Sequence, residues 1–164
     1  MDLTIRPMTI DDLTQVLWIE ERSFTSAWTR KAFQYELNNN LSICMTACYK
    51  GLVIGYVFVQ AVFDEAHILK LAIHPEFRRQ NVGSLLVAHI VDTLTILSCE
   101  KILLEVRRSN DIALRLYEGF GFKKLSVRTD YYIDPTEDAI VMIRRAKVLN
   151  KAQHNIAGEL VPQN

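Results

Sequence analysis

The feature that most constrains the fold is an apolar run at residues 52–63, which is interrupted only by Gly55 and Gln60. The run is too short to cross a bilayer. Because it lacks polar alternation, it is typical of a strand whose two faces are both buried. We therefore expect residues 52–63 to form a central strand of a covered sheet. Gly55 within the run indicates a bulge or a close approach of a neighbouring element.

Apolar periodicity elsewhere predicts a mixed order of elements. A short strand and two helices come first, then three strands, a helix, a strand, a helix and two final strands. This order is typical of a single α/β (α+β) domain with a mixed sheet. The expected strands are residues 3–6, 42–49, 52–63, 66–73, 101–106, 125–132 and 139–145, and the expected helices are residues 10–22, 30–37, 83–97 and 111–119.

Length, charge and cysteine content narrow the class of protein. The chain of 164 residues suits one domain, which we place at residues 1–145, with a polar tail at 146–164 that is loose or a short helix. Nineteen basic residues balance nineteen acidic ones, which argues against binding to nucleic acid or to an anionic membrane. The N-terminus shows no secretory signal, so we expect a cytoplasmic protein. Three cysteines without a Cys-x-x-Cys pair predict reduced thiols and no metal site.

The segment from His74 to Ser84 joins an expected strand to an expected helix and carries two arginines. Backbone amides at a helix N-terminus lack partners and can bind anions. Arg78 and Arg79 add charge of the right sign for phosphate. The segment is therefore either a phosphate-binding loop or an ordinary connection with solvated arginines.

Glu105 lies inside the apolar strand expected at residues 101–106. Burying an ionised carboxylate is costly, so Glu105 must be paired, lie in a cleft or have a raised pKa. A structural ion pair with Lys70 or Arg107 fits the pattern as well as a functional role does.

Asn110 and Tyr117 belong to the helix expected at residues 111–119. Asn110 is a good N-cap for that helix. Tyr117 lies near its end, where a tyrosine is more often a half-buried packing residue with a satisfied hydroxyl than a functional group.

Taken in order, these segments resemble the GNAT superfamily of acetyl-coenzyme A-dependent N-acetyltransferases. The resemblance covers about residues 3–145. It implies a mixed central sheet of about seven strands that splays between the fourth and fifth strands, flanked by about four helices. The motifs that carry it are Arg78-x-x-Asn81-x-Gly83, Leu104-Glu105-Val106-Arg107 and Asn110-x-x-Ala113-x-x-Leu116-Tyr117-Glu118-x-x-Gly121-Phe122.

The resemblance implies that acetyl-coenzyme A lies in the splay. Loop amides would hold its pyrophosphate, and the backbone at residues 71–73 would pair with its pantetheine arm like an added strand. One departure is Asn81, where the family usually has glycine; asparagine is the residue that next most easily adopts left-handed backbone angles. The implied cofactor-binding residues are Leu71, Ala72, Ile73, Arg78, Arg79, Gln80, Asn81, Val82, Gly83, Ser84 and Asn110.

For catalysis, the resemblance implies direct attack by an amine, with Glu105 as base and Tyr117 as acid toward the coenzyme A thiolate. At pH 7 an α-amine is about one-seventh neutral, whereas less than about a thousandth of a lysine amine is neutral. We therefore expect an α-amine acceptor, served through a water by a Glu105 whose pKa is raised by apolar walls.

Within the superfamily the chain resembles the RimI branch, which acetylates the N-terminal alanine of a small-subunit ribosomal protein. The segments Ile19-Glu20-Glu21-Arg22-Ser23-Phe24, Asp64-Glu65-Ala66 and Glu137-Asp138-Ala139 carry this likeness. It implies a ribosomal-protein N-terminus as partner, bound by the residues Phe24, Trp28, Tyr131 and Tyr132.

Other readings of the same sequence stay open. The acceptor is alternatively a lysine side chain, a polyamine or an antibiotic. A non-catalytic acyl-coenzyme A-binding module is a further alternative, although the presence of both Glu105 and Tyr117 argues against it. We expect a monomer or a weak dimer.

Overall fold

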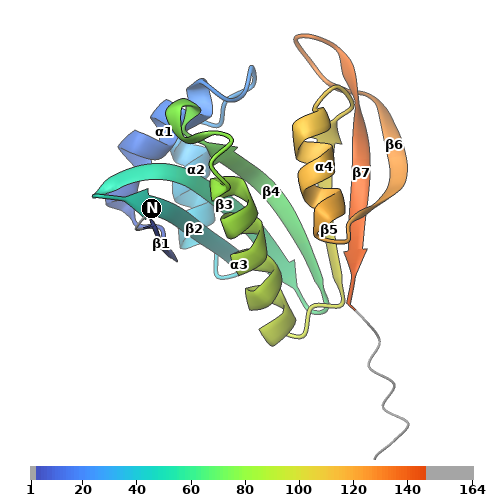
Figure 1. Ribbon diagram of the computed structural model, residues 1–164, viewed down its shortest axis with the longest axis horizontal. Coiled ribbons are helices and arrows are strands. Elements are labelled where there is room, and N and C mark those ends of the chain that lie inside the picture. Colours follow the sequence, from blue (N-terminus) through green and yellow to red (C-terminus); the bar gives the residue numbers. More distant parts are fainter. Residues whose placement is uncertain (1–2, 147–164) are drawn as a thin grey trace, which may run out of the picture.

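Seven strands form one mixed sheet in the order β1-β2-β3-β4-β5-β7-β6 in the computed structural model, which describes residues 3–146 (Figure 1). Only β4 and β5 run parallel; the other neighbouring pairs are antiparallel. The expected mixed sheet is thus confirmed. The strands are β1 (Leu3–Pro7), β2 (Ser42–Tyr49), β3 (Leu52–Val62), β4 (Glu65–Ile73), β5 (Lys101–Arg107), β6 (Lys123–Tyr132) and β7 (Glu137–Arg145).

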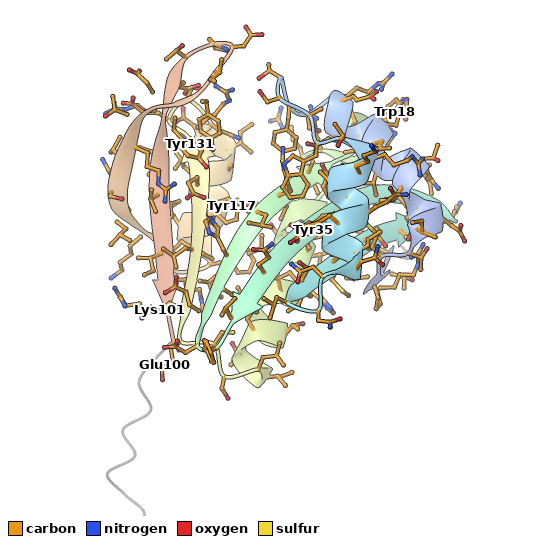
Figure 2. All side chains as sticks on the ribbon, turned by 180° about the vertical axis from the view of Figure 1, so that it is seen from behind. Trp18, Tyr35, Glu100, Lys101, Tyr117 and Tyr131 are labelled. Carbon is orange, nitrogen blue, oxygen red and sulfur yellow. The ribbon has the colours of Figure 1, made fainter. Side chains whose placement is uncertain are left out.

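Helices cover both faces of the sheet. In Figure 1, α3 and α4 lie in front of the strands, and Figure 2 shows α1 and α2 on the opposite face. The apolar residues divide accordingly into two buried clusters: one lies under α3 and α4, and the other lies under α1 and α2. The helices are α1 (Leu13–Glu21), α2 (Arg30–Asn38), α3 (Val82–Ile96) and α4 (Asp111–Gly119), with short 3₁₀ turns at Ile10–Asp12 and Pro75–Phe77.

The apolar run occupies the position that the sequence predicts. In β3, the seven consecutive residues from Val53 to Val59 are all buried. This strand contributes side chains to both buried clusters, because alternate residues point to opposite faces. Burial on both faces explains why the strand carries no polar alternation.

Local signals set most of the element boundaries. Lys50 and Gly51 both have positive φ, 48° and 80°, as a two-residue hairpin between β2 and β3 requires. Thr29 caps α2 by accepting from the amide of Ala32 at 3.3 Å. The helix expected at residues 10–22 is interrupted: it begins as a 3₁₀ turn, where the Asp12 carboxylate accepts from the Thr9 amide and from Arg6. The tail expected beyond Ala146 lies outside the described residues.

The predicted close approach at Gly55 is confirmed. A Cβ atom built on Gly55 would lie 2.8 Å from Cδ1 of Ile73, 3.2 Å from Cδ1 of Leu86 and 3.3 Å from the carbonyl oxygen of Ala72. The absent side chain therefore lets α3 and the end of β4 pack tightly against β3. A neighbouring register shift leaves Ile54 unpaired, which places a bulge beside the glycine.

We predict that Gly55→Ala lowers the free energy of unfolding by about 1–3 kcal/mol, the usual cost of overpacking a well-filled core. Gly119→Ala is the matched control, because a Cβ atom there meets nothing within 4 Å. Urea denaturation monitored by circular dichroism measures both. Equal stability of the two variants would contradict the packing argument.

Candidate active site

The candidate site lies where the two parallel strands β4 and β5 diverge. β4 and β5 pair only through Glu65–Lys101, Ala66–Ile102 and His67–Leu103. A register shift on the other edge of β4 leaves Leu69 unpaired between two β3-bonded neighbours, and such a bulge bends a strand. Beyond His67, β4 therefore keeps β3 as its neighbour but lacks β5. The splay expected between the fourth and fifth strands is confirmed.

The phosphate-loop candidates lie at the start of α3, beside the open end of the splay. Asn81 precedes α3 with φ 63° and ψ 7°, so it adopts the left-handed conformation that asparagine tolerates. The amides of the first turn that follows are free of helix partners. Gly83 lies between α4 and β4, since its Cβ position is 3.5 Å from Leu116 and 3.8 Å from Ile73.

Arg78 links this loop to two other parts of the site. Its Nε donates to the Ile73 carbonyl at 3.1 Å, and its Nη2 donates to the Ser23 hydroxyl at 3.2 Å. The side chain therefore bridges the end of β4 and the loop between α1 and α2. Arg79 and Gln80 are exposed on the same turn, and Arg79 also has a positive φ, 61°. On the β5 side of the open end, Asn110 caps α4 by accepting from the Ala113 amide at 3.1 Å.

Glu105 faces the side of the sheet that α1 and α2 cover. Its side chain is 10% exposed, and its Oε2 lies 2.5 Å from Nε2 of His67, while Oε1 lies 3.4 Å from Arg128. The hydrogen bond with His67 holds the pKa of Glu105 below its usual range; partial burial opposes this effect, and the charges of His67 and Arg128 add to it. The expectation of a pKa raised by apolar walls is therefore wrong, because a hydrogen-bond donor and a cation outweigh desolvation.

The ion pairs expected for Glu105 form elsewhere. Lys70 donates to Glu20 at 2.8 Å, and Arg107 pairs with Glu137 at 3.2 Å. Lys70 finds its carboxylate on α1 and Arg107 finds its carboxylate at the start of the neighbouring strand β7, and the one-dimensional pattern of the strands reveals neither pairing. His67, which replaces them beside Glu105, stands on the neighbouring strand at the last paired position.

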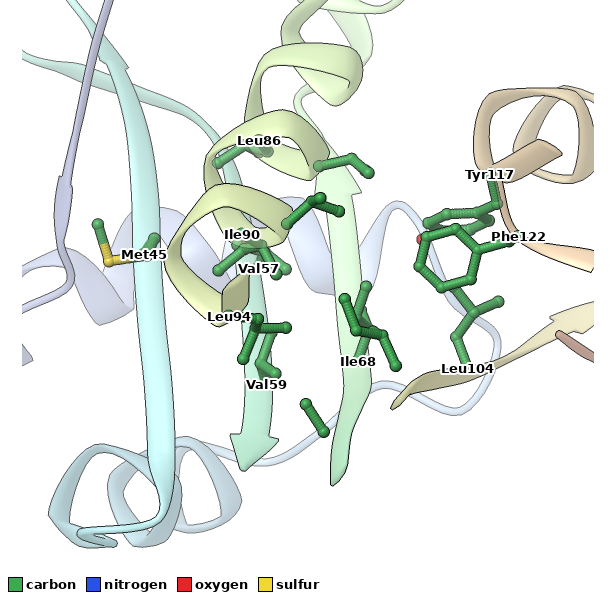
Figure 3. Close-up of a cluster of buried hydrophobic side chains, with 14 of the residues drawn as sticks. Met45, Val57, Val59, Ile68, Leu86, Ile90, Leu94, Leu104, Tyr117 and Phe122 are labelled. Atoms are coloured by element: carbon green, nitrogen blue, oxygen red, sulfur yellow. The ribbon is translucent and has the colours of Figure 1, made fainter. Parts of the chain in front are cut away.

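Tyr117 approaches the splay from the opposite face. Its ring packs against Phe122 and Leu104 in the cluster under α3 and α4 (Figure 3). Because Leu104 and Glu105 are consecutive in β5, their side chains point to opposite faces. Tyr117 and Glu105 therefore flank the same gap from its two sides.

The environment of the Tyr117 hydroxyl favours its protonated form. Burial, and then the proximity of Tyr132, raise the pKa of Tyr117. The residue is 6% exposed. Within residues 3–146 every fully buried side-chain oxygen has a hydrogen-bond partner, whereas the Tyr117 hydroxyl has none there. It follows that this hydroxyl touches solvent.

A buried carboxylate that the sequence reasoning missed anchors the loop between α1 and α2. Glu20 is 0% exposed, and its Oε1 accepts from the Trp28 amide and from Lys70, each at 2.8 Å, while Oε2 accepts from the Tyr56 hydroxyl. The Lys70 ammonium also lies 3.8 Å from the centre of the Phe24 ring. Phe24 and Trp28 are thus fixed above β4. The only sequence signal was a carboxylate next to the apolar stripe of α1.

Arg107 contacts both segments that carry the aromatic residues expected to bind the acceptor. Its guanidinium donates to Thr25, on the α1–α2 loop, at 3.3 Å and to the Pro135 carbonyl, on the β6–β7 loop, at 3.2 Å. It also lies 4.4 Å from the centre of the Tyr132 ring, against which Tyr131 packs edge to face. The four residues expected to bind the acceptor therefore lie on the α1–α2 loop and at the end of β6, which Arg107 connects across the end of β5.

Comparison with known proteins gives a consistent set of relatives. The acetyltransferase (GNAT) family model matches residues 13–122. The ribosomal protein bS18-alanine N-acetyltransferase of Escherichia coli strain K12 is 34% identical over 144 residues, covering 85% of this chain and 95% of that protein. The sequence similarity therefore extends over nearly the whole described domain.

Solved structures agree with the sequence relatives. The crystal structure of the ribosomal-protein-S18-alanine N-acetyltransferase from Escherichia coli superposes with a TM-score of 0.85 and 30% identity, covering 92% of this chain and 97% of that one. The structure of Ard1 from Thermoplasma volcanium superposes with a TM-score of 0.83 and 27% identity, covering 90% and 99%. Among the described residues, no helix is long and apolar enough to span a membrane.

Proposed function

The chain belongs to the GNAT family of acetyl-coenzyme A-dependent N-acetyltransferases, and on that premise we propose that it acetylates the N-terminal α-amine of a protein that begins with alanine. We further propose a small-subunit ribosomal protein as the natural acceptor, in line with the relatives. The observation that carries the proposal is the splay itself, with Tyr117 on one face and Glu105 on the other.

The side of α3 and α4 is assigned to the cofactor. Unpaired amides at residues 82–84 and the left-handed Asn81 make an anion cradle of the kind that binds pyrophosphate. The free edge of β4 at residues 71–73 offers backbone partners to the amides of a pantetheine arm. Arg79 and Gln80 border the cradle, and Asn110 borders the other side of the splay. When bound, acetyl-coenzyme A supplies an acetyl thioester that an amine attacks directly.

The side of α1 and α2 is assigned to the acceptor peptide. Phe24 and Trp28 on the α1–α2 loop, with Tyr131 and Tyr132 at the end of β6, form aromatic walls around the position of the first residue. Walls of this kind leave room for a small side chain such as that of alanine. Lys70, Arg107 and Arg128 on the same side are each paired with a carboxylate, so this side offers no surplus of acidic groups for a polycationic acceptor such as a polyamine.

Glu105 is assigned as the base that accepts the proton of the attacking amine, through a water. Its low pKa keeps it ionised at neutral pH but makes it a weak base. An α-amine fits such a base, because its own pKa of about 7.7–8.0 leaves much of it neutral. A lysine side chain, whose pKa is about 10.4, would need a stronger base.

Tyr117 is assigned as the acid that protonates the leaving thiolate. Its raised pKa ensures that the proton is present at neutral pH. Since a thiol has an ordinary pKa near 8.5, the leaving group needs little help, and loss of Tyr117 should cost less than loss of Glu105.

We predict that Glu105→Gln keeps the fold and cofactor binding but lowers turnover by about a hundredfold or more, the scale of a positioned base. Glu65→Gln is the matched control, since this carboxylate on β4 is 56% exposed and only 4.0 Å from Lys101. Thiol release measures turnover, and calorimetry measures acetyl-coenzyme A binding. Wild-type turnover in Glu105→Gln at pH 7 would remove the base assignment.

We predict that Asn81→Gly binds acetyl-coenzyme A as tightly as the wild type or more tightly, because glycine adopts the observed φ of 63° without strain. Asn81→Ala should bind more weakly, since a left-handed alanine costs about 1–2 kcal/mol and the cradle would relax. Isothermal titration calorimetry compares the three proteins. Weaker binding by Asn81→Gly would instead assign the asparagine amide a contact of its own.

The acceptor itself is tested with a peptide that starts with alanine and carries an internal lysine. We predict acetylation of the α-amine alone, detected by mass spectrometry. Activity should rise between about pH 6.5 and 8.5 as the α-amine loses its proton, because Glu105 titrates well below that window. A blocked N-terminus should abolish the product. Acetyl groups on the lysine, or activity that survives the block, would favour a lysine acetyltransferase instead.

A further inference from the structure

His67 is the group in closest polar contact with Glu105, and it occupies a special place in the fold. It is the last β4 residue that pairs with β5, so it stands at the point where the two strands part. Its side chain is 37% exposed and faces the acceptor side, opposite to the buried Ala66 and Ile68. Its Nε2 lies 2.5 Å from Oε2 of Glu105.

The direction of this hydrogen bond follows from the charge state of Glu105. An ionised carboxylate has lone pairs and no hydrogen, so it can only accept. Nε2 of His67 must therefore carry the hydrogen, and Oε2 of Glu105 is committed to it. The other oxygen, Oε1, faces Arg128 at 3.4 Å, beyond the range of a charge-assisted hydrogen bond.

The neighbours of His67 on the adjacent strands have other partners and do not compete for its hydrogen bond with Glu105. On β5, Leu103 is its paired neighbour, and on β3 it is Gln60. The Gln60 amide is held at 3.0 Å by both carboxylate oxygens of Glu36 from α2. From β6, Arg128 lies 3.4 Å from Oε1 of Glu105, and the Glu105 charge contributes to the raised pKa of Tyr132.

We propose that His67 is the positioning residue of the base: it fixes Oε2 of Glu105 through its Nε2–H and so leaves Oε1 to receive the proton of the amine. This inference rests on the proposed function, since it assigns Glu105 as base. The proton leaves nitrogen as the new N–C bond forms and reaches Oε1 through a water, while the thioester C–S bond breaks and the thiolate takes the proton of Tyr117. Solvent then restores both residues.

If His67 positions Glu105, its loss should change the pH dependence of activity, whereas loss of a residue that only packs should not. Without His67, partial burial of Glu105 is opposed only by Arg128, so the pKa of Glu105 must rise. The base would then take up a proton at higher pH than it does in wild type. The defect should be largest in acid and smallest in alkali, whereas a misfolded site would fail at every pH.

The experiment compares wild type, His67→Leu and His67→Gln on the alanine peptide across pH. In wild type, log kcat/KM should rise below neutrality with a slope near one, because the α-amine loses its proton there while Glu105 stays ionised. In His67→Leu we expect the slope to steepen toward two at the acid end, with a loss relative to wild type of at most about tenfold for each pH unit below the raised pKa of Glu105. His67→Gln, which keeps an N–H donor, should regain most of the activity. His89→Leu, on α3, is the control.

A second readout needs no acceptor. The Glu105 carboxyl carbon, labelled with ¹³C and assigned by its loss in Glu105→Gln, should titrate at higher pH in His67→Leu than in wild type. An unchanged titration, or a loss of activity that is uniform over pH and not rescued by His67→Gln, would overturn the positioning role. If wild type left the alanine peptide unmodified, the proposed function would fail, while the titration would still decide whether His67 sets the state of Glu105.

Discussion

The parting of β4 from β5 is the constraint on which the rest of the molecule depends. Parallel strands normally bury both faces and satisfy their backbones by continuous pairing. Here pairing stops after His67, and the bulge at Leu69 directs β4 away from β5. The strand edge thus left free has polar groups that call for a partner. An extended, amide-bearing ligand arm supplies such partners at little cost in protein reorganisation.

The gap also separates two chemical environments. On the face under α3 and α4, apolar residues surround Tyr117, and burial holds its proton in place. On the face under α1 and α2, hydrogen bonds and cations keep Glu105 ionised. The proposed donor and the proposed acceptor of protons therefore lie on opposite faces of the sheet.

Charge pairs of unequal strength shape the acceptor side. Glu20 is fully buried with three donors, so removing the one cation among them, Lys70, would leave an uncompensated charge at a cost of several kcal/mol. The pair Arg108–Asp138, with an arginine 62% exposed, is worth about 1 kcal/mol or less. The α1–α2 loop is thus held rigidly by Glu20, while the rim of the β6–β7 loop is held more loosely. Arg107 joins the two.

Sequence reasoning predicted the features whose causes are local. The apolar run predicted β3, Asn110 and Thr29 predicted helix starts, and Lys50-Gly51 predicted a hairpin. The surroundings of Glu105 could not be predicted from the sequence, because His67 lies 38 positions away. The periodicity of a strand does not indicate which residue of a neighbouring strand contacts a carboxylate. The same holds for Glu20 and Lys70, which are 50 positions apart. The prediction of a raised pKa for Glu105 was wrong for that reason.

The most direct test of the account joins cofactor and acceptor in one molecule. Coenzyme A is linked through an acetyl bridge either to the α-amine of an alanine-first peptide or to the side chain of its internal lysine, and calorimetry measures the affinity of each. We predict that the α-linked compound binds at least about a hundredfold more tightly than coenzyme A alone, as ligands that span both sites do. The lysine-linked compound should gain little affinity over coenzyme A. Equal or tighter binding of the lysine-linked compound would contradict this prediction.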